Sequence, residues 1–147
     1  MRKIKENIVI SQEKTFNFVA IIVIQYGNRF DLYFEVGRIK DHVAAVMGSG
    51  DLHVFATPAM VALMENAAML AVAEYLPEGA TTVGAMMNTS HVKPSPVDET
   101  IQATATLTGI EGRKLTFSIK AEDSKGVIGE AEHVRFIVDR ERFMSKL

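Results

Sequence analysis

The sequence predicts an α+β domain in which an antiparallel β-sheet wraps around one long central α-helix. A helix-forming stretch that is apolar on nearly every side runs from Pro58 to about Leu76, as expected of a helix buried in a core. The rest of the chain after that helix shows alternating apolar and polar residues, separated by residues typical of tight turns. This pattern predicts β-strands joined by hairpins. A chain of 147 residues is long enough to bury a core of this kind in one domain.

The first thirty residues differ in charge from the rest, with five Lys or Arg against two acidic residues. They contain the longest apolar run, Phe18 to Ile24, which is far shorter than the roughly 20 residues that span a bilayer. No small-residue cleavage pattern follows it, so we expect a cytoplasmic protein. The β-branched residues favour one or two extra strands with a turn at residues 26–29. We therefore expect an N-terminal extension without an assigned role over residues 1–30 and the working domain over residues 31–147.

The central helix has clear boundary signals. Thr57 is a good N-cap, because its hydroxyl can accept a hydrogen bond from a free amide of the first turn. Pro58 suits the first helical position, where no amide donor is needed. Pro77 and Gly79 end the helix. Strands are expected around this helix, with turns at residues 111–113 and 123–126; the expected strands cover residues 34–37, 83–92, 101–108, 115–119 and 127–138.

Composition excludes several kinds of chemistry. The absence of cysteine excludes disulfides, zinc–thiolate sites, iron–sulfur clusters and cysteine nucleophiles. A net charge of −2 gives no basic field to attract nucleic acid. His42, His53 and His133 show no metal-ligand spacing, so we expect no metal. No Gly-x-Ser-x-Gly elbow is present, which disfavours that type of serine hydrolase.

Four residues could carry chemistry. Glu65 lies on the apolar helix, where a carboxylate must either reach a basic partner or serve catalysis. His91 ends the strand after the helix, on the face that strand parity assigns to Val83 and Met87, and is either structural or a proton carrier. Thr57 lies at a helix N-terminus, whose free amides can hold an oxyanion. Gly84 lets a ligand approach a strand closely.

These residues resemble a known family. Val54-Phe-Ala-Thr57-Pro through Glu65-Asn-Ala-Ala68, with Gly84 and Asn88-Thr-Ser-His91 downstream, is similar to hotdog-fold acyl-CoA thioesterases of the fluoroacetyl-CoA thioesterase-like branch. The resemblance implies that Thr57, Glu65 and His91 are catalytic. It also implies that Gly84 lies at the substrate carbonyl and Arg135 lies near the site.

One departure concerns the acyl group. Members that are specific for fluoroacetyl groups carry aromatic lid residues where this chain has Gly48 and Asp51. The departure favours a different or broader acyl group.

The resemblance implies hydrolysis of an acyl-CoA to a free acid and CoA, with no cofactor beyond the coenzyme A of the substrate. The alternatives are a non-catalytic module that binds acyl-CoA or another acyl ligand, and, more weakly, a hydratase. Thr57 and Glu65 are eight residues apart, or about 12 Å along one helix, which predicts a homodimer, or a higher homo-oligomer, that pairs them across a two-fold axis. Lys93, Arg113 or Lys114 could meet CoA phosphates. No nucleic acid or membrane partner is expected.

Overall fold

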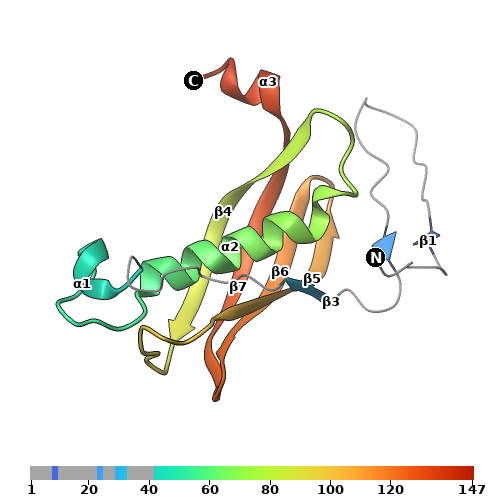
Figure 1. Ribbon diagram of the computed structural model, residues 1–147. Coiled ribbons are helices and arrows are strands. Elements are labelled where there is room, and N and C mark those ends of the chain that lie inside the picture. The colour runs from blue at the N-terminus through green and yellow to red at the C-terminus, as the bar shows by residue number, and fades with distance from the viewer. Residues whose placement is uncertain (1–7, 10–22, 25–28, 33–41) are drawn as a thin grey trace.

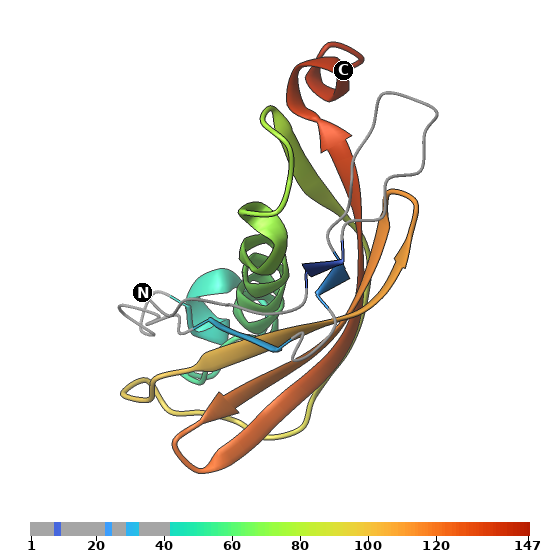
Figure 2. The same ribbon diagram turned by 90° about the vertical axis from the view of Figure 1, so that its right-hand side faces the viewer.

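The computed structural model describes residues 8–9, 23–24, 29–32 and 42–147, with side chains from residue 42 onward. Its main feature is a five-stranded antiparallel sheet that curves around one long helix (Figures 1 and 2). The predicted α+β class, with a sheet wrapped around a central helix, is confirmed. The strand expected at residues 34–37 and residues 26–28 of the expected turn lie outside the described residues, whereas Arg29 of that turn begins the strand β3 (Arg29–Leu32).

The strand order in the sheet is β3-β5-β6-β7-β4, so β4 and β3 form the two edges. Hairpins join β5 to β6 and β6 to β7, and the turns use Gly112 and Gly126 at φ 60° and 126°, a region that favours glycine. β3 begins at Arg29, just before the predicted start of the working domain, and a separate short pair is formed by β1 and β2. The strands are β1 (Ile8–Val9), β2 (Val23–Ile24), β3 (Arg29–Leu32), β4 (Ala80–His91), β5 (Gln102–Glu111), β6 (Lys114–Asp123) and β7 (Gly126–Asp139).

The central helix α2 (Thr57–Ala73) packs its alanine, methionine and leucine side chains against β5, β4 and β6. It ends before Leu76, because residues 74–76 form a turn. The predicted N-cap is wrong: the cap position is Ala56, and Thr57 is the first helical residue with its hydroxyl bonded elsewhere. Two short helices complete the fold, α1 (Ala44–Met47) and α3 (Arg140–Met144).

The expectation that α2 is buried on all sides holds only for the side facing the sheet. On the other side, Ala62, Leu70 and Ala73 are exposed. None of the described residues covers this strip, so its apolar side chains remain open to solvent. An apolar helix face left open in one chain favours association with another chain.

A β-bulge interrupts β4. The register against β7 shifts between Gly84 and Met86, so Ala85 is an extra residue in the edge strand. One extra residue reverses the alternation of side chains from that point on. The parity argument that grouped His91 with Val83 is therefore wrong, and His91 shares the helix-facing side with Gly84 instead.

Candidate active site

Thr57 and His91 form a direct pair at one end of α2. The Thr57 hydroxyl oxygen lies 2.8 Å from Nδ1 of His91, which joins the first residue of the helix to the last residue of β4. The Phe55 ring contacts the imidazole edge-on, with ring centroids 6.4 Å apart. The geometry suits transfer of a proton between a hydroxyl and an imidazole.

The His91 ring is kept neutral near pH 7. Burial lowers the pKa of His91 from its ordinary 6.5, and the backbone of Lys93 opposes the shift only in part. The second ring nitrogen, Nε2, is buried and has no hydrogen-bond partner. A buried nitrogen without a partner costs free energy, so a substrate or a second subunit that supplied a partner here would recover it.

A pocket of about 270 Å³ opens beside this pair. Val54, Phe55 and Pro94 supply apolar wall, and Ala44 of α1 closes one side. Thr57 and His91 face the same space. The apolar wall of the pocket therefore lies next to two side chains that can transfer a proton, Thr57 and His91.

Glu65, Gly84 and Arg135 meet in a second group further along α2. Oε2 of Glu65 lies 3.6 Å from Nη1 of Arg135, and the Glu65 side chain is 43% exposed whereas that of Arg135 is almost fully buried. A Cβ atom at Gly84 would lie only 3.0 Å from the same Glu65 oxygen. The carboxylate thus has the basic partner that one interpretation of the sequence required, and it also faces the glycine.

Sequence reasoning missed His133, a member of this second group. It is 1% exposed in β7, and its ring contacts both the carbonyl oxygen of Met86 and the Arg135 guanidinium. The signal that could have found it is the His133-Val-Arg135 spacing, since alternate strand residues face the same side.

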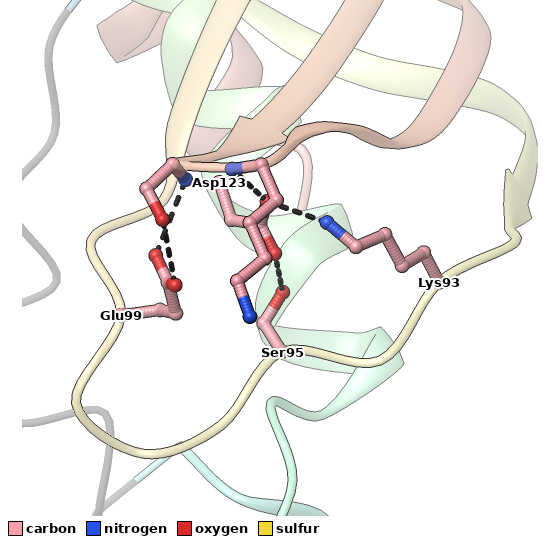
Figure 3. Close-up of polar contacts among 6 residues, drawn as sticks. Lys93, Ser95, Glu99 and Asp123 are labelled. Atoms are coloured by element: carbon pink, nitrogen blue, oxygen red, sulfur yellow. Dashed lines mark hydrogen bonds and ion pairs between the residues drawn. The ribbon is translucent and has the colours of Figure 1, made fainter.

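A further cluster fixes the loop after His91. Lys93 and Ser95 donate to the two carboxylate oxygens of Asp123, at 2.8 and 2.9 Å, and Figure 3 shows both bonds meeting at the β6–β7 hairpin. Ser95 is fully buried, and its carbonyl accepts from the Phe55 amide at 2.9 Å. Lys93 is therefore held by Asp123 at the rim of the pocket.

The other basic candidates lie at the β5–β6 hairpin. Arg113 is exposed there, and Lys114 lies 3.7 Å from Glu111. Neither contacts the two groups described above. Within the described part of the chain, no group of three or more His, Asp or Glu side chains could hold a metal ion.

The two groups are not joined within one chain. In the described residues, no hydrogen bond or ion pair links Thr57 or His91 to Glu65 or Arg135. One group consists of a hydroxyl and an imidazole, and the other contains a carboxylate and a guanidinium.

A curved antiparallel sheet around a long helix, with a carboxylate on the helix, defines the hotdog class of thioesterase-like proteins. A family model described as fluoroacetyl-CoA-specific thioesterase (FlK) matches residues 39–141, and the chain belongs to this family of acyl-CoA thioesterases. The fluoroacetyl-CoA thioesterase of Streptantibioticus cattleyicolor is 37% identical over 94 residues, which are 64% of this chain and 68% of that protein.

Solved structures agree with this assignment. A structure of the fluoroacetyl-CoA thioesterase FlK has a TM-score of 0.76 at 31% identity, covering 84% of this chain and 95% of the other. A hot-dog-like protein from Thermanaerovibrio acidaminovorans has a TM-score of 0.69 at 21% identity, covering 80% of this chain and 86% of its own, which supports the fold alone. No helix in the described part of this chain is long and apolar enough to cross a membrane.

Proposed function

We propose that the protein hydrolyses an acyl-CoA thioester, releasing a carboxylic acid and CoA, at sites formed between two subunits. The observation that carries the proposal is the division of the chemistry into two groups. The Thr57–His91 pair can move a proton, while Glu65 presents a partly exposed carboxylate beside Gly84. Thioester hydrolysis requires both functions.

Glu65 would activate the attacking oxygen. Its carboxylate either takes a proton from water as a general base or attacks the carbonyl carbon itself to form a transient anhydride, which water then hydrolyses. In both routes the carbon–sulfur bond breaks, and the departing thiolate accepts a proton. His91 would orient the nucleophile with Thr57 and protonate the leaving sulfur, while amides at Gly84 or at the helix N-terminus would stabilise the developing oxyanion.

A homodimer would bring the two groups together. The outer edge of β4 has no neighbouring strand among the described residues, and the apolar strip of Ala62, Leu70 and Ala73 is open. The nearby Asn66 side-chain oxygen is buried without a partner. Antiparallel pairing of two β4 edges would bring the Glu65 group of one subunit toward the Thr57–His91 pair of the other.

Mixed dimers test this arrangement. Thr57→Val and Glu65→Gln variants are each expected to be nearly inactive. A purified heterodimer of the two contains one wholly wild-type site if each site takes Thr57 from one subunit and Glu65 from the other, and it should regain up to about half of the wild-type rate. If both residues acted within one chain, every site would carry one substitution and no activity would return.

The acyl group is expected to be larger than fluoroacetyl. The lid positions Gly48 and Asp51 are exposed, and neither supplies an aromatic side chain. The adjacent pocket has a volume of about 270 Å³. We propose that its apolar wall accepts acyl chains of about four to eight carbons.

An acyl-CoA panel tests both reaction and substrate. Release of free thiol is followed with acetyl-, fluoroacetyl-, butyryl-, hexanoyl-, phenylacetyl- and palmitoyl-CoA, for the wild type and for Glu65→Gln. We expect turnover that is greatest for the mid-sized groups and falls by about 100-fold or more in the variant. Binding of acyl-CoA without thiol release would favour the non-catalytic binding module instead.

A further inference from the structure

His133 makes two contacts that together specify one form of its ring. Nδ1 lies 2.7 Å from the carbonyl oxygen of Met86, and Nε2 lies 3.2 Å from Nη1 of Arg135. A carbonyl only accepts and a guanidinium only donates. Nδ1 must therefore carry the proton and Nε2 must be free of one, which is a single neutral tautomer.

The surroundings favour that neutral form. Burial lowers the pKa of His133, the positive charge of Arg135 lowers it further, and the Met86 carbonyl and Glu65 oppose the shift only in part. The Phe117 ring covers the imidazole at a centroid distance of 6.4 Å. The imidazole can thus accept from Arg135 at any pH near neutrality.

Arg135 is fixed on the remaining sides by Thr82. Nε donates to the Thr82 hydroxyl at 2.8 Å, and Nη2 donates to the Thr82 carbonyl at 2.9 Å. Because the guanidinium is a rigid plane, these bonds and the contact with His133 leave Nη1 directed at Glu65. The cation that His133 contacts is therefore the one that faces the Glu65 carboxylate.

The other contact of His133 holds the β4 bulge. Met86 follows the extra residue Ala85, and the bulge sets the position of Gly84 beside Glu65. A bulge in an edge strand has lost part of its ladder and needs other bonds to keep its shape. One buried imidazole thus contacts both sides of the reaction centre, the Arg135 side and the Gly84 side.

We propose that His133 is a positioning residue for thioester hydrolysis, holding Arg135 and the β4 bulge so that Glu65 and Gly84 face the same substrate carbonyl. The proposal rests on the proposed function, in which Glu65 supplies the reacting carboxylate. It assigns no contact between His133 and substrate.

Two substitutions separate the two contacts. His133→Gln can place a carbonyl oxygen near Nε2 and keep an acceptor for Arg135. His133→Asn can place an amide donor near Nδ1 and keep only the bond to Met86. His133→Phe removes both, and Ile137→Val, at another buried position of β7, is the control for loss of packing.

Steady-state kinetics with a turned-over acyl-CoA gives the readout, alongside thermal unfolding and dimer mass. We expect kcat to fall by about 10- to 100-fold in His133→Phe with little change in KM. In the Gln variant, kcat should stay several-fold above that of the Asn variant at equal stability. Ile137→Val should lower the unfolding temperature without changing kcat.

The outcomes distinguish this proposal from the proposed function. Wild-type kcat in Glu65→Gln would remove the role of Glu65, whatever His133 does. An inactive Glu65→Gln with wild-type kcat in His133→Phe would overturn the positioning role alone. If His133→Phe does not fold, wild-type kcat in both the Gln and the Asn variants overturns it.

Discussion

The hydroxyl of Thr57 and Nδ1 of His91 lie 2.8 Å apart, although one residue begins a helix and the other ends a strand. Thr57→Val removes the hydroxyl and keeps the shape of the side chain. We expect kcat/KM for thioester hydrolysis to fall by about 100-fold, because proton transfer through a positioned group contributes roughly this much. Thr57 is exposed and caps nothing, so the free energy of unfolding should fall only by the loss of this hydrogen bond, about 1 kcal/mol.

The matched control for that change is Thr57→Ser, which keeps the hydroxyl. It should retain most of the activity. Equal activity in the Val variant and the wild type would show that the hydroxyl takes no part in the reaction.

The pH dependence of turnover should reflect the His91 environment. Burial lowers the pKa of His91 from 6.5, so the imidazole stays neutral, and able to accept the Thr57 proton, below that pH. The acid limb of log kcat/KM that reports His91 should therefore fall below pH 6.5. Initial rates between about pH 4.5 and 8.5 measure it, and a limb at 6.5 or above would contradict the assignment.

The fold was predictable because its signals are local. The apolar stretch of α2 and the alternation in β5 and β6 reflect only which side of each element faces the core. The parity of β4 was not predictable, because no local signal marks Ala85 as an extra residue in the strand. That one residue decides that Gly84 and His91 face the same side.

The site was predictable only in part. The sequence indicates Glu65 as a carboxylate that needs a partner, but the residues alone do not identify Arg135 as that partner. The cap prediction for Thr57 failed for a related reason. A threonine at a helix start can bond a backbone amide or a distant side chain, and only the packing of β4 beside α2 decides in favour of His91.

Gly84 leaves room that a side chain would fill. In Gly84→Ala the new Cβ would lie 3.0 Å from the Glu65 carboxylate and 3.5 Å from Arg135. The carboxylate must then shift by a few tenths of an ångström, and we expect kcat to fall by about tenfold or more, because small misplacements of reacting groups are costly.

The control for Gly84→Ala is Gly109→Ala in β5. There a Cβ would meet only Thr116, at an ordinary 3.7 Å. Kinetics and thermal unfolding of both variants measure the contrast. A loss of kcat in Gly109→Ala as large as that in Gly84→Ala would show a general effect of strand rigidity.

Acid should weaken the cluster in which Lys93 and Ser95 donate hydrogen bonds to Asp123. Burial of Asp123 alone would raise the pKa of its carboxyl. Hydrogen bonds from Lys93, the Lys125 amide and Ser95, with the Lys93 charge, outweigh burial and lower the pKa from 3.8 to about 2. A lowered carboxyl pKa contributes stability that is complete above the unfolded value of 3.8 and is lost as the pH falls toward about 2.

Asp123→Asn removes this contribution. The variant should be less stable than the wild type by about 1–2 kcal/mol near neutral pH, and the difference should shrink toward zero as the pH approaches about 2. Urea unfolding at a series of pH values measures it. Glu130→Gln is the control, because the Glu130–Lys120 pair spans 3.7 Å with both side chains more than half exposed, and such pairs contribute little. A difference for Asp123→Asn that stayed constant with pH would assign its cost to packing rather than to the carboxylate charge.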